Sequence, residues 1–345
     1  MKIAVIIPVT RPEQAAICVD ALSKQSFLNS EIEIILIKDK DQVIELKKTD
    51  IKIIIIEEEN PHPAFRRNLG VKLTNARILA FLDDDTIPCS EWLSEAVRYI
   101  EKESVDGVCG PELQSQNNLS LGYTLAGAAN ETFFVEGVER MNVTSEGPVR
   151  FYNIRLCNVI MRRKVWEAVG GFNEIANYHI DDIEFFYLAC NKKYRFHYIP
   201  KMLVHHRPEP FPFRYLKKKF NERFYTGMNA MMFREIYSLI PQIWFVYLLY
   251  PIIILIFLLF FSNSMYIMPF LAIYFGLILW FSYPWFRKNK KIFILLPIVF
   301  ISTHIVELIG FLAGTFYFFV NRNYGDVTVR IKQGRLEKCS ESLTL

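Results

Sequence analysis

The feature that most limits the possible folds is an apolar run that ends in three adjacent carboxylates. Residues 78–82 are all apolar, and Asp83, Asp84 and Asp85 follow directly. Such a run is typical of a buried strand, and open α/β sheets bind ligands at the carboxyl ends of their strands. Neighbouring carboxylates repel one another unless a cation compensates them, and hard divalent ions prefer oxygen ligands. The run predicts either a cation site or an acidic turn before a helix at Glu91–Ile100.

Apolar runs alternate with stretches of helical spacing through the first 100 residues. Strands are predicted at Lys2–Val9, Ile32–Ile37 and Ile51–Ile56, and helices at Arg11–Gln25 with Thr10 as N-cap, Gln42–Lys48 and residues 64–71. Strands that alternate with helices at this spacing form right-handed βαβ units. The predicted fold class is therefore α/β, with a mostly parallel sheet flanked by helices.

The pattern is weaker after residue 104. Strands are predicted at Val105–Gly110, Phe151–Met161, Tyr194–Ile199 and Met202–Val204, and helices at Lys164–Val169 and from Asp181 onward. Residues 112–146 are polar, contain glycine and have weak periodicity. This composition favours a loop region that faces an acceptor.

The last third of the chain is far more apolar than the rest. Residues 243–261, 265–286 and 292–320 are each long enough to cross the hydrocarbon core of a bilayer. The third segment is predicted either to span or to form a re-entrant hairpin broken near Pro297 or Gly310. His304 and Glu307 lie one helical turn apart within it and are expected to satisfy each other.

Basic residues lie beside these apolar segments. Residues 213–233 carry arginine and lysine among aromatic residues, which predicts an amphipathic helix within a membrane-interface segment at 213–240. The basic run 287–291 and the basic residues before the first apolar segment favour the cytoplasmic side. A single third span would place the basic tail 321–345 outside, against this rule, whereas a re-entrant hairpin would keep it inside. The sequence thus predicts a multi-pass protein of the cell membrane with a cytoplasmic catalytic domain at residues 1–212. A net charge of +4 gives no support for nucleic acid as a partner.

The order of motifs resembles a family 2 glycosyltransferase with the GT-A type fold, in its membrane-attached form. The resemblance covers residues 2–230 and rests on these motifs in this order: Pro8 at the end of the first strand, Asp39 after the second, Arg67-Asn68, Asp83-Asp84-Asp85, Gly170-Gly171-Phe172, Asp181-Asp182, and His206 after the last strand. By themselves, Arg66 and Arg67 are more simply interpreted as an exposed pair.

The resemblance implies that a nucleotide-diphosphate sugar lies across the strand ends. It assigns donor binding to Pro8, Asp39, Arg67, Asp83 and Asp84. It assigns Mg²⁺ or Mn²⁺ to Asp85, with His206 as a second ligand, and the role of base to Asp182. Possible contacts with the acceptor, or supporting positions, are Asp181, Asn158 and Arg223.

The chain departs from the family pattern at two motifs. Lys38-Asp39-Lys40-Asp41 stands where Asp-Asp-Gly-Ser is usual, which leaves open whether Asp39 or Asp41 contacts the nucleotide. Asp181-Asp182 replaces the usual Glu-Asp pair. The Gln-x-x-Arg-Trp motif of processive synthases is not matched at residues 221–224, which favours the addition of a single sugar.

Three functions remain open from the sequence. The first is a metal-dependent inverting transferase that acts on a lipid-linked or membrane-proximal acceptor in glycan or polysaccharide biosynthesis. The second is a polyprenyl-phosphate sugar transferase, whose ionised acceptor needs no strong base. The third is a non-catalytic membrane scaffold that binds nucleotide sugars.

Overall fold

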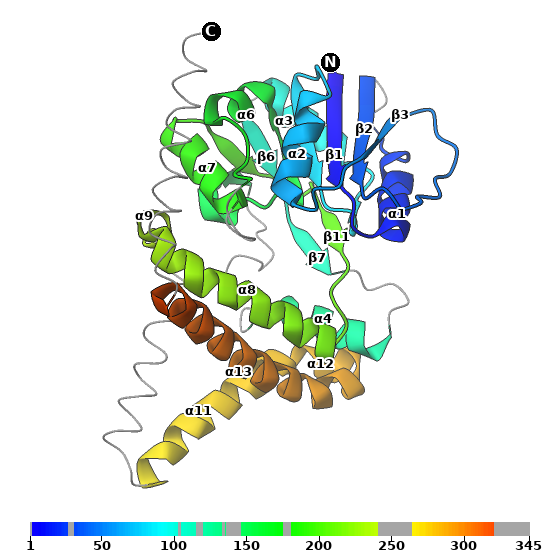
Figure 1. Ribbon diagram of the computed structural model, residues 1–345. Coiled ribbons are helices and arrows are strands. Elements are labelled where there is room, and N and C mark those ends of the chain that lie inside the picture. The colour runs from blue at the N-terminus through cyan, green and yellow to red at the C-terminus, as the bar shows by residue number, and fades with distance from the viewer. Residues whose placement is uncertain are drawn as a thin grey trace. The chain divides into compact units, whose positions relative to one another are not determined.

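The computed structural model describes residues 2–26, 31–102, 105–114, 120–132, 135, 146–174, 181–240 and 264–320. These fall into two compact units. The first contains the described residues up to Leu113 and from 146 to Arg207. The second contains the described residues from Gln114 to 135 and from Pro208 onward. Figure 1 labels helices and strands of both units.

The first unit is built on an eight-stranded sheet with the strand order β3-β2-β1-β4-β9-β6-β10-β8. The strands are β1 (Lys2–Pro8), β2 (Glu31–Lys38), β3 (Lys52–Glu57), β4 (Ile78–Leu82), β6 (Gly107–Cys109), β8 (Gly147–Pro148), β9 (Asn158–Arg162) and β10 (Phe196–Tyr198). The first four are mutually parallel, whereas β9 runs antiparallel to both β4 and β6. The predicted mixed α/β fold with a mostly parallel sheet is confirmed.

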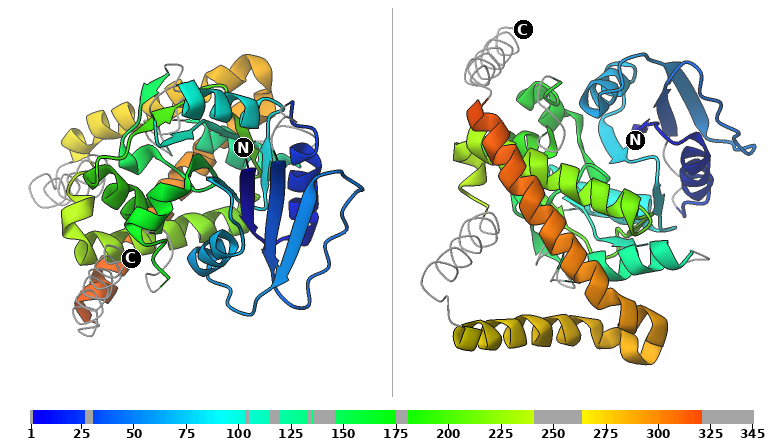
Figure 2. Two further views of the ribbon diagram at one scale, coloured as in Figure 1. Left: turned by 90° about the horizontal axis from the view of Figure 1, so that it is seen from above. Right: turned by 60° about the horizontal axis from the view of Figure 1, so that its bottom comes forward.

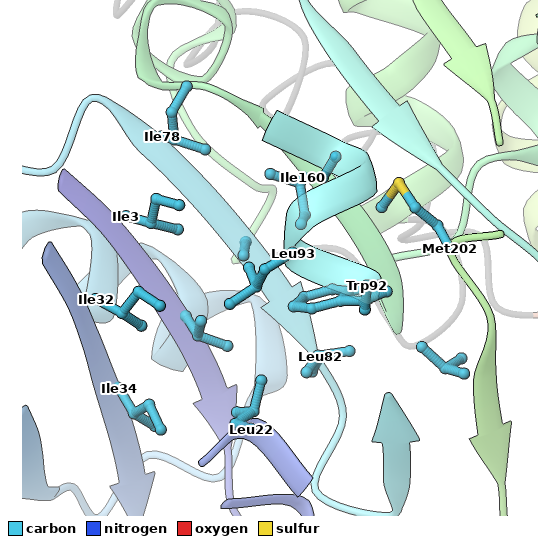
Figure 3. Close-up of a cluster of buried hydrophobic side chains, with 14 of the residues drawn as sticks. Ile3, Leu22, Ile32, Ile34, Ile78, Leu82, Trp92, Leu93, Ile160 and Met202 are labelled. Carbon is cyan, nitrogen blue, oxygen red and sulfur yellow. The ribbon is translucent and has the colours of Figure 1, made fainter. Parts of the chain in front are cut away.

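Alternating side chains of the strands feed two cores, one on each face of the sheet. Ile3, Val5 and Ile7 of β1 pack on one face with α1 (Pro12–Leu22) and α3 (Trp92–Lys102), as Figure 3 shows in part. Ala4 and Ile6 point to the other face. That face is covered by α2 (Pro63–Lys72), α6 (Arg163–Val169) and α7 (Asp181–Asn191). The period of two residues along a buried strand accounts for this division.

A second, three-stranded sheet carries part of the site. Its order is β5-β11-β7, with β5 at Thr86–Pro88, β11 at Val204–His206 and β7 at Glu112–Gln114. Strands β5 and β11 are antiparallel, and their register pairs His206 with Thr86. His206 therefore lies beside the residue that follows Asp85.

Three local predictions about the first 146 residues are wrong. Residues 42–48 form no helix, because Ile44 and Leu46 pack against the core while Val43 is exposed, an alternation that requires extended chain. Arg11, not Thr10, occupies the N-cap position of α1. The predicted loop region contains the helix α4 (Leu121–Asn130), whose buried side includes Leu125 and Ala129.

The second unit is helical. Besides α4 it contains α8 (Phe213–Met232), α9 (Arg234–Tyr237), α11 (Ser264–Ser282), α12 (Pro284–Lys288) and α13 (Lys290–Val320). The helix predicted at 213–233 is confirmed, and α8 lies side by side with α13 (Figures 1 and 2). The predicted break near Pro297 or Gly310 is wrong, because α13 continues through both residues.

Within the described part of the chain, α13 is the one helix that is long and apolar enough to cross a membrane. The segment predicted to span at 265–286 is divided between α11 and α12, and the one predicted at 243–261 lies outside the described residues. The described residues therefore do not support a multi-pass arrangement.

His304 and Glu307 do not satisfy each other as predicted. The hydroxyl of Tyr274 lies 2.9 Å from Nδ1 of His304, and Arg223 of α8 lies 3.2 Å from Glu307. His304 and Glu307 thus each have a partner on a different helix, which lowers the cost of burying them.

Gly314→Leu is expected to lower the stability of the second unit by about 3 kcal/mol. A Cβ atom at Gly314 would overlap the carbonyl oxygen of Phe224 on α8, a backbone atom that cannot turn aside. Gly276→Leu is the matched control, because no atom lies within 4 Å of a Cβ at that exposed position. Thermal unfolding in detergent, followed by helical circular dichroism, should show a lower Tm for the first variant alone. Equal Tm values for both would contradict this close packing.

Candidate active site

The predicted site residues after β1, β2 and β4 meet at one edge of the large sheet. β1 lies between β2 and β4 and is parallel to both, so the three carboxyl ends are neighbours. Pro8 is the buried last residue of β1 and pairs with Ile37. Asp39 follows the end of β2, and the three aspartates begin directly after β4.

Asp84 joins the ends of two strands. It is buried, and one of its oxygens accepts hydrogen bonds from the backbone amides of Thr10 (2.5 Å) and Arg11 (2.6 Å) and from the Thr10 hydroxyl (2.9 Å). Burial and the charge of Asp85 raise the pKa of Asp84, while these hydrogen bonds act in the opposite direction. Asp84 is thus placed to fix the loop after β1. A contact between Asp84 and the nucleotide-sugar donor stays a prediction.

Asp85 belongs to a buried polar chain with His206 and Glu112. Nε2 of His206 lies 3.0 Å from Oδ1 of Asp85, and Nδ1 lies 2.5 Å from Oε1 of Glu112. Arg11 pairs with the other oxygen of Asp85. Burial opposes a charged imidazole, but the two carboxylates outweigh it and raise the pKa of His206 to about 10.

Asp85 and His206 suit a divalent ion that also binds a diphosphate. The described residues contain no group of three or more His, Cys, Asp or Glu side chains arranged as a metal cage. Mg²⁺ is commonly held by one or two carboxylates together with substrate phosphates, so a complete protein cage is not required. A ligating histidine usually donates its other ring N–H to a carboxylate, and Nδ1 of His206 lies 2.5 Å from the carboxylate of Glu112. Asp85 therefore fits the implied cofactor, and Nε2 of His206 fits it once metal binding displaces the proton on that nitrogen.

Arg66 and Arg67 are buried, so their interpretation as an exposed pair is wrong. Arg66 donates to the carbonyl oxygens of Val9 (2.7 Å) and Asn60 (2.9 Å) and pairs with Asp39. It thereby joins the loops after β1, β2 and β3. The side chain of Asp39 stays 46% exposed at this position, which leaves it accessible to a ligand.

Arg67 connects the acidic strand end to the start of α7. Its guanidinium lies 2.8 Å from Asp83 and 3.1 Å from Asp181. Both contacts are charge-assisted, and they bring motifs about one hundred residues apart to the same place.

Arg67→Met is expected to destabilise the first unit by about 3 kcal/mol, because it leaves two carboxylates without their cation. Breaking a buried ion pair costs about 3–5 kcal/mol, and we place this loss at the low end because the Asp83 side chain is 36% exposed. Arg67→Lys keeps the charge but not the two-pronged geometry, and we expect it to recover about half of the loss. Urea unfolding measures both effects. Wild-type stability of the methionine variant would show that the two ion pairs contribute little.

Asn68 fixes the turn that precedes α7. Its side-chain oxygen accepts a hydrogen bond from the Phe172 amide (2.9 Å), and its amide nitrogen donates to the Phe172 carbonyl (2.8 Å). Gly171 has a φ of 84°, which favours glycine, and a Cβ atom there would lie 2.9 Å from the Asn68 oxygen. The Gly-Gly-Phe motif thus holds the turn after α6 against α2.

Asp182 has the properties of a base near neutral pH. It lies in the first turn of α7, where its Oδ1 accepts a hydrogen bond from the Ile183 amide (2.8 Å). Burial, and then the charge of Asp181, raises the pKa of Asp182 to about 6. A carboxylate with a pKa close to the working pH both stays ionised and accepts a proton efficiently.

The remaining predicted residues lie elsewhere. Asn158 is buried and binds Trp92 (2.7 Å), the Met202 carbonyl (2.8 Å) and the Pro111 carbonyl (3.0 Å), so it supports the strand that carries Glu112. Arg223 belongs to the second unit and is paired with Glu307. These contacts give both residues structural roles, and acceptor contacts by them remain untested.

Sequence reasoning missed Glu112 and Arg11 and misjudged Arg66. Glu112 begins a three-residue strand inside a weakly periodic region, and no local pattern links it to His206. Arg11 follows a strand end, which was a usable signal, because side chains at the carboxyl ends of parallel strands gather at one edge.

Comparison with known proteins agrees with this geometry. Residues 4–165 match the sequence profile of Glycosyl transferase family 2. The chain therefore contains a family 2 glycosyltransferase domain. It is 27% identical over 235 residues to Glycosyltransferase AglE of Haloferax volcanii, a match that covers 63% of this chain and 70% of AglE.

Two further similarities are weaker. The chain is 26% identical over 114 residues to the poly(ribitol-phosphate) beta-N-acetylglucosaminyltransferase TarS of Staphylococcus aureus, and the match covers 31% of this chain and only 20% of TarS. Mannosyltransferase PcManGT from Pyrobaculum calidifontis, solved with GDP-Man and Mn²⁺, superposes with a TM-score of 0.55 at 14% identity, over 90% of this chain and 86% of PcManGT. The latter similarity shows the GT-A-like fold alone.

Proposed function

We propose that this glycosyltransferase moves a sugar from a nucleotide-diphosphate donor with inversion, in a reaction that depends on Mg²⁺ or Mn²⁺. The observation that carries the proposal is the gathering of Asp39, Asp83 and Asp85 at one sheet edge, with Arg67 linking that edge to the helix of Asp182. The presence of GDP-Man and Mn²⁺ in a protein of similar fold supports the same chemistry.

Each residue has a separate task in this proposal. Asp39, half exposed beside Arg66, contacts the nucleoside from the end of β2, and Asp83 contacts the nucleoside side of the donor from the end of β4. A divalent ion held by Asp85 and His206 would act as a Lewis acid and compensate charge on the departing diphosphate. Asp182 removes the proton from the acceptor hydroxyl. Attack from the face opposite the leaving group inverts the anomeric centre.

We place the acceptor at a membrane, as a lipid-linked or membrane-proximal molecule, with the catalytic unit on the cytoplasmic side. The support is the apolar second unit, in which most exposed large side chains of α11 and α13 are aliphatic or aromatic. A polyprenyl phosphate remains the alternative acceptor, although the raised pKa of Asp182 favours a hydroxyl that must be deprotonated. The family match favours a transferase over a non-catalytic scaffold.

The proposal is tested by a screen of nucleotide sugars with the full chain in membranes. We expect transfer to a lipid-extractable product with one or two donors, strict dependence on Mg²⁺ or Mn²⁺, and loss of transfer in EDTA. Donor turnover that persists unchanged in EDTA would overturn the metal dependence. Failure of every donor with membranes that contain both lipid-linked sugars and polyprenyl phosphates would overturn the proposed reaction.

Glu112→Gln is expected to weaken Mn²⁺ binding by about 10–100-fold. The amide keeps the size of the side chain but removes the charge that orients His206 through the 2.5 Å contact with Nδ1. Titration of Mn²⁺ by electron paramagnetic resonance, with a nucleoside diphosphate present, measures this without turnover. Glu91→Gln, at an exposed position, is the matched control. Equal Mn²⁺ affinities of the two variants would show that Glu112 does not act through His206.

A further inference from the structure

The helix α13 has two opposite faces of different character. One face is buried within the second unit and includes Leu296, Thr303, Glu307, Gly310 and Gly314. The opposite face is exposed and consists of Ile294, Ile298, Ile305, Ile309, Leu312, Phe316 and Phe319. These seven residues, the apolar stripe, recur at intervals of three, four or seven positions, which places them along one side of the helix.

The buried face of α13 follows α8 for most of its length. Gly310 and Gly314 lie against the backbone of Phe220 and Phe224, and Glu307 pairs with Arg223. Residue numbers rise together along the two helices, from Gly310 beside Phe220 to Gly314 beside Phe224. The helices therefore run in the same direction, and they lie side by side in Figure 2. Any path that α13 takes through a bilayer must therefore be shared by α8.

The exposed side of α8 is unsuited to hydrocarbon. Arg214, Lys217 and Asn221 of α8 are exposed. If the pair crossed a bilayer, these charged and polar groups would enter the apolar core, which is strongly unfavourable. A helix pair with one apolar stripe and one cationic side is instead suited to lie in the plane of the interface.

A cationic cluster borders the stripe at its beginning. Arg287, Lys288, Lys290 and Lys291 are exposed and lie within five positions immediately before Ile294. Basic residues next to a membrane-facing surface attract anionic lipid headgroups. The charge and the apolar stripe together fit a bilayer that contains anionic phospholipid better than another protein.

We propose that α13 is an in-plane membrane anchor, whose apolar stripe inserts lengthwise into one leaflet of an anionic bilayer, and that this helix does not cross the membrane. This anchor extends the proposed action at a membrane. It rests on the proposed function only in that the function says which molecule is the acceptor. It would hold the catalytic unit against the surface where a lipid-linked acceptor is presented.

The test is a depth measurement on the full chain in vesicles of phosphatidylcholine and phosphatidylglycerol at 3:1. A bimane label is attached at Ile294→Cys, Ile305→Cys or Phe316→Cys, one at a time. The background replaces Cys89, Cys190 and Cys339 by alanine, and lipids brominated at different depths serve as quenchers. Positions 294 and 316 are about 33 Å apart along a helix, close to the thickness of the hydrocarbon core.

An in-plane helix predicts the same shallow depth at all three positions, about 5–10 Å below the headgroups. A deep label at 305 with shallow labels at 294 and 316 would mean that α13 crosses, and it would overturn the proposal. Labels that no lipid quenches would also overturn it, because the stripe would then be covered by protein. Depth is measured without turnover, so this result is independent of whether sugar transfer is found.

The cationic cluster is tested with the same label at 294. We expect brominated phosphatidylglycerol to quench it about twofold better than an equal fraction of brominated phosphatidylcholine. Replacing all four cations by glutamine should abolish this preference, and the label at 316 should show none in either protein. An unchanged preference in the glutamine variant would overturn the assignment of anionic lipid to the cluster.

Discussion

Asp182→Asn is expected to lower kcat by about 10²–10⁴-fold with a hydroxyl acceptor, because the amide cannot take the acceptor's proton. In the wild-type protein, kcat/KM should rise with pH through a midpoint near 6, the pKa to which burial and Asp181 raise this group. Below that pH the carboxyl is protonated and unable to act as base. The variant should lose this acidic limb of the pH profile.

The same pKa shift predicts that the loss is not caused by unfolding. A carboxyl whose pKa is higher in the folded protein than in the unfolded chain is less favourable in its charged form after folding, so folding is penalised increasingly as the pH rises from about 4 to 6. The neutral amide escapes this penalty, and we expect Asp182→Asn to unfold at the same or a higher temperature at pH 8. Asp50→Asn, an exposed change before β3 at the opposite edge of the sheet, is the control.

A different outcome would identify a different acceptor. If Asp182→Asn keeps most of its turnover and the wild-type profile has no limb near pH 6, no base is needed. This result would favour a phosphate acceptor, which is already ionised at neutral pH.

Asp85→Ala is expected to reduce metal-dependent transfer by about 10³-fold, since it removes the carboxylate proposed to hold the ion that compensates the leaving diphosphate. Mn²⁺ titration with a nucleoside diphosphate present should show a parallel loss of binding. Asp50→Ala should retain wild-type values for both. Wild-type activity of Asp85→Ala would exclude this residue from the site.

Asp85→Ala also disturbs the protein around it, because His206 and Arg11 lose a partner. Asp85→Asn keeps the shape and the hydrogen-bonding capacity, so it separates the two effects. We expect the asparagine variant to unfold close to the wild-type temperature and to bind Mn²⁺ as poorly as the alanine variant. Strong Mn²⁺ binding by the asparagine variant would mean that packing, not the charge at position 85, sets the affinity.

The three adjacent aspartates show where sequence reasoning was sufficient and where it was not. Their position at the end of a buried strand was predicted correctly from the apolar run before them. The repulsion among them is relieved in a way that the sequence does not reveal. Asp83 pairs with Arg67, and Asp84 accepts hydrogen bonds from backbone amides of the loop after β1. Asp85 contacts His206 and Arg11.

The amphipathic helix at residues 213–233 was similarly predictable only in part. Its helical spacing is local and was read correctly. That Arg223 meets Glu307 across a helix pair, and that His304 meets Tyr274 instead of Glu307, depends on packing between segments far apart in the chain.

The sequence by itself determined the α/β class, most of the strands near the N-terminus and the places where acidic motifs follow strands, because each depends on local periodicity and on the alternation of short segments. Only the tertiary structure decided which partner each charged group has and which face of α13 is exposed. It also decided that a weakly patterned segment supplies Glu112 to the site. Those features depend on contacts between residues distant in sequence, which packing selects among many alternatives that local patterns leave equal.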